Sequence, residues 1–163
     1  MTYKTAVCDD SAADRQYLSD LVQQWARSAG HTVTIAEFPS AESFLFHYAE
    51  EKDYDILLLD IEMGNMDGIT MARRLRREND TVQIVFITGY SDYIAEGYEV
   101  DALHYLMKPT GRDKLFSVLD RAAEKLKKNE KVLTLETGGE TIRIPVYQIR
   151  YADVQGNYVT IHA

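Results

Sequence analysis

The sequence is poor in the features that mark secreted, disulfide-bonded and membrane-spanning proteins. Cys8 is its single cysteine, so no intrachain disulfide is possible and a reducing, cytoplasmic location is predicted. The longest strongly apolar runs, Ile56–Leu59 and Ile84–Ile87, have four residues each. A membrane-spanning helix needs ~20 consecutive apolar residues. Residues 1–10 also lack the apolar stretch of a signal peptide, so no membrane association is expected.

Positive charge is scarce as well. The chain has 18 Lys and Arg residues against 26 Asp and Glu residues, which gives a net charge of −8. This balance argues against binding to nucleic acid or anionic lipid through bulk charge. With 45% apolar and 27% charged residues, the composition is that of a folded globular protein. A length of 163 residues favours one domain, or one domain and part of another.

Short apolar runs alternate with longer amphipathic stretches over about the first 128 residues. The runs that predict strands are Thr5–Cys8, Val33–Ile35, Ile56–Leu59, Val82–Ile87 and Ala102–Met107. The stretches that predict helices lie around Leu18–Trp25, at Ala41–Glu50, Ile69–Arg77 and Ser91–Tyr98, and around Leu115–Leu126. Five strand-then-helix units in a row predict an α/β fold, with a parallel sheet covered by helices on both faces.

Two helix starts carry a recognisable capping pattern. Ser11, followed three residues later by Asp14, resembles a capping box for the first helix, and Gly30 is placed to end that helix. Thr110 and Asp113 have the same spacing before the fifth helix. We therefore expect the side chains of Ser11 and Thr110 to accept hydrogen bonds from the first turn of each helix.

The pattern changes near residue 129. Lys125–Asn129 is charged and has few apolar residues, so we expect a linker there. Beyond it, three strands without intervening helices are predicted at Val132–Leu135, Thr141–Ile144 and Tyr158–Ile161, with a hairpin turn at Gly138-Gly139. The 34 residues from 130 to 163 are fewer than the ~40 that usually fold alone. This tail either docks on the first domain or begins a longer one.

Polar side chains stand at the ends of four of the predicted strands. These residues are Asp9, Asp10, Asp60, Thr88 and Lys108. In a parallel sheet the carboxyl ends of the strands meet at one rim, where ligand sites form. Neighbouring carboxylates repel one another unless a cation lies among them. A hard divalent cation with oxygen ligands, such as Mg²⁺, suits such a site.

The remaining groups at this rim suit phosphoryl transfer. A carboxylate can act as a nucleophile and form an acyl phosphate, and Asp60 on the central strand is placed to do so. Lys108 would hold phosphoryl oxygens as a point charge, and Thr88 would donate a hydrogen bond. Taken singly, an aspartate at a strand end is more often a helix cap, and a lysine before proline a loop charge. Their combination at four strand ends favours Mg²⁺-dependent phosphorylation of Asp60.

These residues lie within ordered motifs that span residues 1 to about 128. The motifs are Val7–Asp10, Leu57–Met63, Met66–Gly68, Phe86–Gly89 and Tyr105–Pro109. With them the chain resembles the receiver domain of bacterial two-component response regulators. The resemblance implies a flavodoxin-like, doubly wound sheet of five parallel strands in the order 2-1-3-4-5. It also implies a stoichiometric phosphoacceptor rather than an enzyme.

Site roles follow from the same resemblance. Asp60 would take a phosphoryl group from a phosphohistidine on a sensor histidine kinase. Asp10 and Asp60 would bind Mg²⁺ directly, Asp9 would support it, and the backbone carbonyl of Glu62 would complete the protein ligands. Thr88 and Lys108, grouped with Asp60 as the reactive set, would hold the phosphoryl oxygens.

The resemblance further implies a switch and leaves one property open. Tyr105 matches the aromatic residue through which such domains relay phosphorylation to a distant face, and activation can bring homodimerisation. Gly64 stands where proline is usual in the family. Glu62 and Tyr90 occupy positions that tune dephosphorylation, so the lifetime of the phosphoryl group is not predicted.

The tail carries a second resemblance. Ile142–Pro145, Ile149–Tyr151 and Gly156–His162 look like the first strands of a LytTR-type DNA-binding domain, as found in regulators of the LytR/AgrA-like family. The predicted organisation is therefore a receiver over 1–128, then a linker and the first part of such a domain over 129–163. DNA binding through the complete output domain follows from this resemblance, since the tail's own charge does not indicate it.

Two other functions stay open. An aspartyl-nucleophile phosphatase also forms a carboxyl phosphate on an α/β sheet, but it typically needs an aspartate two residues after its nucleophile, where this chain has Glu62. A phosphorylation-independent interaction module could keep the receiver fold without the chemistry. Retention of the complete polar set at the strand ends argues against that module.

Overall fold

The computed structural model describes residues 2–129, 132–137, 140–145, 151–155 and 158–162, with side chains described over 2–128. The chain divides into two compact units, Met1–Ala122 and Ala123–Ala163, and each is described by itself. The elements up to the long final helix are β1 (Thr2–Cys8), α1 (Ala12–Ala29), β2 (Thr32–Phe38), α2 (Ala41–Tyr48), β3 (Ile56–Leu59), α3 (Gly68–Arg76), β4 (Gln83–Thr88), α4 (Ile94–Glu99), β5 (His104–Met107) and α5 (Arg112–Asn129).

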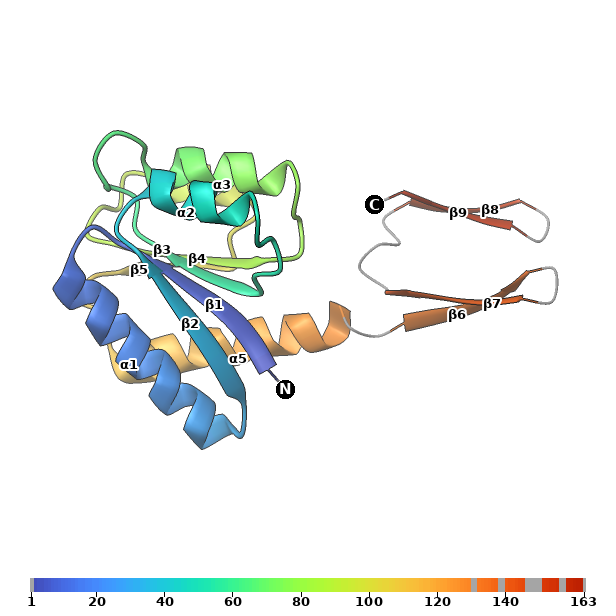
Figure 1. Ribbon diagram of the computed structural model, residues 1–163, viewed down its shortest axis with the longest axis horizontal. Helices are drawn as coiled ribbons and strands as arrows, with labels where there is room; N and C mark the ends of the chain where they lie inside the picture. The colour runs from blue at the N-terminus through green and yellow to red at the C-terminus, as the bar shows by residue number, and fades with distance from the viewer. Residues whose placement is uncertain (1, 130–131, 138–139, 146–150, 156–157, 163) are drawn as a thin grey trace. The chain divides into compact units, whose positions relative to one another are not determined.

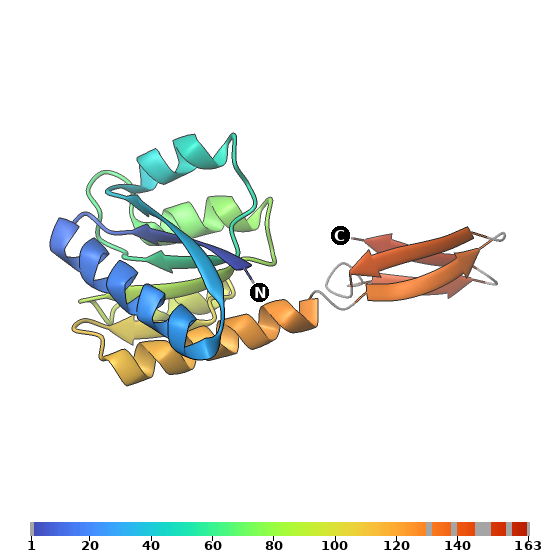
Figure 2. The same cartoon turned by 60° about the horizontal axis from the view of Figure 1, so that its bottom comes forward.

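The first five strands form one parallel sheet in the order β2-β1-β3-β4-β5, which confirms the predicted fold class. Helices α1 and α5 lie on one face of this sheet, and α2 and α3 lie on the other (Figures 1 and 2). Because both faces are covered, every residue of β3 and of β4 is buried. This double burial explains why these strands are apolar without alternation.

Local sequence signals set most of the helix ends. The side chain of Ser11 accepts a hydrogen bond from the backbone N–H of Asp14, and Gly30 ends α1 in the left-handed conformation with φ of 74°. Both features were predicted. Asp67 caps α3 in the same way, accepting from the N–H of Thr70 at 2.7 Å. These caps place the loops that follow β1 and β3.

Two predictions about α5 are wrong. The hydroxyl of Thr110 donates to the carbonyl of Met107 and α5 begins only at Arg112, so Thr110 is not the cap that its spacing suggested. Lys125–Asn129, predicted as a linker, continues α5. Its charges lie on a helix of strong helix formers, and a low apolar content therefore marked an exposed helical end and not a break.

The second unit contains two antiparallel strand pairs. Strand β6 (Val132–Thr137) pairs with β7 (Glu140–Pro145), and β8 (Tyr151–Gln155) pairs with β9 (Tyr158–His162). The hydrophobic pattern predicted β6, β7 and β9. For β8, only the resemblance to a LytTR-type domain suggested a strand, at Ile149–Tyr151, of which Tyr151 lies in β8. The expected turn at Gly138-Gly139 lies outside the described residues.

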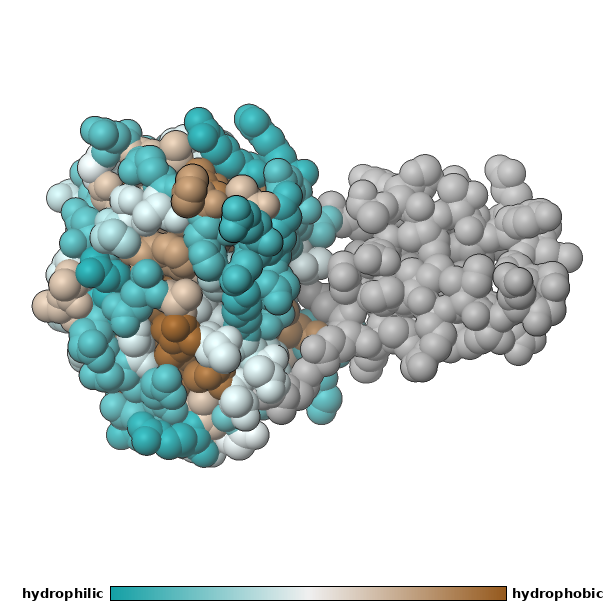
Figure 3. Space-filling model, in the orientation of Figure 1, coloured by the Kyte–Doolittle hydropathy of each residue, from teal (hydrophilic) through white to brown (hydrophobic). Residues whose placement is uncertain are grey.

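The surface of the first unit is mostly hydrophilic on the face drawn in Figure 3, with small, separate apolar patches. Within the described part of the chain, none of the helices combines the length and the apolar character that a membrane crossing requires.

Gly68 gives the fold a direct test, because it packs against the residue that follows β3. A Cβ atom added at Gly68 would lie 2.1 Å from the carbonyl oxygen of Asp60. We expect Gly68→Ala to lower the free energy of unfolding by about 2–3 kcal/mol, since the backbone must shift to relieve this overlap. Urea denaturation measures the change.

Gly89→Ala is the matched control, because a Cβ there would meet nothing within 4 Å. It should change the free energy of unfolding by less than about 1 kcal/mol. Equal stability of the Gly68→Ala protein and the wild type would contradict the described packing of the loop after β3.

Candidate functional site

The register of the sheet brings the predicted side chains to one rim. Cys8 lies opposite Leu59 in the β1–β3 pairing, so the residues that follow them, Asp9 and Asp60, are neighbours. The backbone N–H of Asp60 donates to the carbonyl of Cys8 at 2.9 Å, which extends this pairing to the first site residue. Asp10 follows Asp9 at the same strand end.

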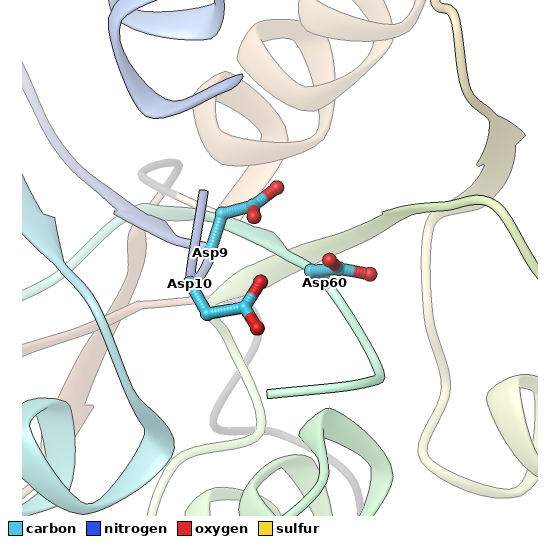
Figure 4. A group of neighbouring side chains, drawn as sticks. All are labelled: Asp9, Asp10 and Asp60. Carbon is cyan, nitrogen blue, oxygen red and sulfur yellow. The ribbon is translucent and has the colours of Figure 1, made fainter. Parts of the chain in front are cut away.

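These three aspartates form a potential metal site. One carboxylate oxygen from each of Asp9, Asp10 and Asp60 lies within 4.8 Å of the others. Figure 4 shows the three carboxylates gathered at the ends of their strands. Asp9 and Asp60 are buried, while Asp10 is exposed. Three hard oxygen donors with one side open to water fit Mg²⁺, which keeps part of its hydration shell when it binds.

Lys108, which directly follows β5, is a cation in contact with two of these carboxylates and with that of Asp14. Its Nζ lies 2.7 Å from Oδ2 of Asp9, 3.1 Å from Oδ2 of Asp60 and 2.8 Å from Oδ2 of Asp14. Asp10 lies beside Asp9 and Asp60, so four aspartates gather near one ammonium, which contacts three of them. Carboxylates therefore outnumber the ammonium at this rim. That excess favours a second, divalent cation.

The pKa values of Asp9 and Lys108 are both shifted by the close approach of these charged groups. Burial raises the pKa of Asp9, and the charge of Asp60 adds to the rise, although hydrogen bonds from Lys108 and from the N–H of Ser11 oppose it. Burial alone would lower the pKa of Lys108, but hydrogen bonds to Asp14, Asp9 and Asp60 outweigh it and raise that pKa. Lys108 therefore stays charged while Asp9 is costly to ionise.

Hydrogen bonds hold the Asp60 carboxylate and the backbone at Asp9 in place. The N–H of Ile61 donates to Oδ1 of Asp60 at 2.7 Å. Nη1 of Arg15 donates to the carbonyl of Asp9 at 2.7 Å. In Asp60, Oδ1 is thus held by the backbone and Oδ2 by Lys108, so the carboxylate has a fixed orientation at the rim.

Two hydrogen bonds hold the loop after β3 in place. The N–H of Gly68 donates to the carbonyl of Ile61 at 2.7 Å. The exposed carboxylate of Glu62 accepts a hydrogen bond from the hydroxyl of Tyr93 at 3.2 Å, which joins this loop to the start of α4. Gly64 has a φ of 92°, which proline cannot adopt. The backbone at Gly64 therefore has a conformation that a proline at this position could not adopt.

Thr88 and Tyr105 each form a hydrogen bond with the backbone of Tyr90. Thr88 ends β4 fully buried, and its Oγ1 accepts a hydrogen bond from the N–H of Tyr90 at 3.4 Å. The hydroxyl hydrogen of Thr88 is not used in that bond. The half-buried Tyr105 packs on Phe86 and donates its hydroxyl hydrogen to the carbonyl of Tyr90. The loop after β4 therefore connects the hydroxyl at the rim to the aromatic residue on β5.

The structure brings together most of the residues that the sequence singled out. Asp9, Asp10, Asp60 and Lys108 are neighbours, and Thr88 lies at the adjacent strand end. Glu62 is two residues along the loop from Asp60, with its side chain turned to Tyr93. The roles assigned to these six residues stay predictions.

Asp14 and Tyr93 make contacts that the sequence did not predict: Asp14 with Lys108 and Tyr93 with Glu62. Asp14 was read only as the partner of Ser11 in a helix cap, yet its carboxylate binds Lys108. Its position in the first turn of α1, close in sequence to Asp9 and Asp10, was the signal that could have indicated a place near the site. Tyr93 carried no comparable signal.

The comparisons with known proteins identify the family of the first unit. A family model described as response regulator receiver domain matches residues 6–120. The chain therefore belongs to the response regulator receiver domain family, and its first unit is the receiver domain of a two-component response regulator.

Relatives support the same family, and a solved structure supports the fold. An uncharacterized response regulatory protein of Vibrio cholerae is 30% identical, covering 78% of this chain and 48% of that protein. The sensory transduction protein LytR of Streptococcus mutans is 27% identical, covering 95% of this chain and 67% of that protein. The BeF3-activated receiver domain of DrrB from Thermotoga maritima has a TM-score of 0.66 at 24% identity, covering 76% of this chain and 99% of that chain, and shows the fold.

The resemblance to LytR-type regulators is thereby confirmed. The chain spans about half to two thirds of the length of the relatives it matches first.

Asp9 gives a stability test of the site electrostatics. Its folded-state pKa is raised, so the folded protein binds a proton there more readily than the unfolded chain does, and ionised Asp9 destabilises the fold. In the absence of divalent cations we expect Asp9→Asn to raise the free energy of unfolding at neutral pH by about 1 kcal/mol.

This gain should shrink as the pH falls from about 7 towards about 4, because Asp9 itself becomes neutral in the folded protein. Urea denaturation of both proteins across this range measures it. Asp113→Asn, at an exposed position of α5, is the control and should show no such pH-dependent difference. A stability loss in Asp9→Asn at neutral pH would contradict the described environment of Asp9.

Proposed function

We propose that this receiver accepts a phosphoryl group on Asp60, with Mg²⁺ bound by Asp10, Asp60 and the backbone carbonyl of Glu62 and supported by Asp9. The observation that carries the proposal is the hydrogen bond of 3.1 Å between Lys108 and Asp60 beside an acidic cluster. A buried carboxylate next to a fixed ammonium has its charge partly balanced and faces a donor for incoming phosphoryl oxygens.

The proposed donor is a phosphohistidine on a sensor histidine kinase. A carboxylate oxygen of Asp60 attacks the phosphorus atom, a P–O bond forms and the P–N bond to the imidazole breaks. The departing imidazole keeps the electron pair of that bond and takes a proton from water. The product is an aspartyl phosphate, formed once per chain, so the protein acts as a stoichiometric acceptor.

The residues at the rim fit this chemistry. When bound, Mg²⁺ would neutralise charge on the phosphoryl oxygens. Lys108 would donate to one of those oxygens as a point charge. Thr88 would donate its free hydroxyl hydrogen to another. A negative group on Asp60 would thus draw both side chains toward the end of β3.

The same movement offers a route to the surface. The N–H of Tyr90 binds the hydroxyl of Thr88, and the carbonyl of Tyr90 binds the hydroxyl of Tyr105. If Thr88 turns toward a phosphoryl group, the loop that carries Tyr90 shifts and releases or reorients Tyr105. Phosphorylation would then change the populations of two conformations, one of which forms a homodimer.

The proposed output is transcriptional. We assign residues 1–128 to the receiver and 129–163 to a linker and the first part of a LytTR-type DNA-binding domain. Support comes from the motifs of the tail and from the match to LytR of Streptococcus mutans, which covers 95% of the chain. DNA binding belongs to the complete output domain, and the site of action is the cytoplasm.

The phosphatase alternative receives little support from the geometry. Its acid–base residue would be Glu62, and that carboxylate is exposed and hydrogen-bonded to Tyr93. The phosphorylation-independent module has no specific contact in its favour.

Intact-mass spectrometry after incubation with acetyl phosphate tests the proposed function. The wild type should gain one phosphoryl group with Mg²⁺ and none after the metal is chelated. Asp60→Asn should gain none under either condition, because its amide cannot form the acyl phosphate.

Asp113→Asn is the control for loss of one exposed carboxylate, and it should be phosphorylated like the wild type. An equal gain of mass in Asp60→Asn would show that the nucleophile is another residue. Absence of any gain in the wild type would favour the phosphorylation-independent module.

A further inference from the structure

The ammonium group of Lys108 has no spare hydrogen-bond donor in this structure. A protonated lysine has three N–H bonds. Asp9, Asp14 and Asp60 accept from Nζ at 2.7, 2.8 and 3.1 Å. Three donors therefore meet three acceptors. Lys108 can reach a phosphoryl oxygen only if one of these bonds opens or is shared.

Asp14 differs from the other two acceptors. It comes from the first turn of α1 and not from a strand end, and it is outside the group of carboxylates that could hold a metal. Its side chain is 43% exposed, compared with 1% for Asp9 and 8% for Asp60. Water can solvate an exposed carboxylate when its partner leaves, so the bond to Asp14 is the least costly of the three to break.

We propose that Asp14 is a positioning residue that competes with the phosphoryl oxygens of phosphorylated Asp60 for the ammonium group of Lys108. The inference rests on the proposed function. Asp14 adds a negative charge beside the phosphoryl group and occupies one of its donors. Both effects disfavour the phosphorylated arrangement.

Asp14 has the opposite effect on the metal. By sharing the charge of Lys108, it reduces the hold of the ammonium on Asp9 and Asp60, and its own charge adds to the attraction for a cation. The proposal thus requires that removal of the Asp14 charge strengthens phosphoryl binding and weakens Mg²⁺ binding. A side chain that served only to stabilise the first turn of α1 would affect both in the same direction or neither.

Isothermal titration calorimetry on the full chain tests this pair of effects with Mg²⁺ and with BeF3⁻ as the phosphoryl mimic. The variants are Asp14→Asn and the control Asp20→Asn, an exposed aspartate of the same helix whose carboxylate accepts a hydrogen bond from Gln16. For Asp14→Asn we expect the dissociation constant of BeF3⁻ at saturating Mg²⁺ to fall about two- to fivefold, as for loss of a partly exposed ion pair.

The dissociation constant of Mg²⁺ alone should rise by a similar factor in Asp14→Asn, and both constants should be unchanged in Asp20→Asn. Weaker binding of both ligands, or no change in either, would overturn the proposal. Thermal unfolding shows whether Asp14→Asn is folded, and Asp14→Ser serves as the second variant.

Binding of Mg²⁺ and BeF3⁻ by the wild type distinguishes failure of the proposed function from failure of the proposed role of Asp14. If it binds neither Mg²⁺ nor BeF3⁻, the proposed function fails and this inference fails with it. If the wild type binds both and Asp14→Asn binds them equally well, only the competition by Asp14 is wrong.

Discussion

The contact between the ammonium of Lys108 and the carboxylates at the sheet rim is the interaction on which the site depends. Asp9 and Asp60 are buried side by side, and without a cation their repulsion would oppose the pairing of β1 with β3 at this end. Lys108 supplies one positive charge from β5. Because one ammonium is fewer than the carboxylates around it, the rim keeps an excess of acidic groups, which would favour binding of a divalent cation.

Backbone packing and hydrogen bonds fix the orientation of Asp60 at this rim. The carbonyl of Asp60 lies against Gly68, where no side chain would fit, and the carboxylate is held between the N–H of Ile61 and Lys108. From Thr88 a second set of bonds leads through Tyr90 to Tyr105. The side chains that could sense a phosphoryl group are thus connected to the surface by two hydrogen bonds and one short loop.

The sequence predicted the sheet and the rim residues, because continuous apolar runs and polar strand ends are direct consequences of a parallel sheet covered on both faces. The strand order, which the structure confirms, was implied only by the resemblance to receiver domains. Predictions failed where a local pattern had two meanings. The spacing of Thr110 and Asp113 resembled a cap, but the hydroxyl of Thr110 donates to Met107. Lys125–Asn129 resembled a linker, but charged residues also suit an exposed helix end. The contacts of Asp14 and Tyr93 depend on tertiary placement, which spacing does not encode.

The central claim is that Asp60, held by Lys108, is the carboxylate that becomes phosphorylated. Borohydride reduction of the phosphorylated chain, followed by peptide mass mapping, tests this directly because it converts an aspartyl phosphate into homoserine at the modified residue. The account predicts homoserine at Asp60 alone. Homoserine at Asp9, Asp10 or Asp14, with Asp60 intact, would contradict it.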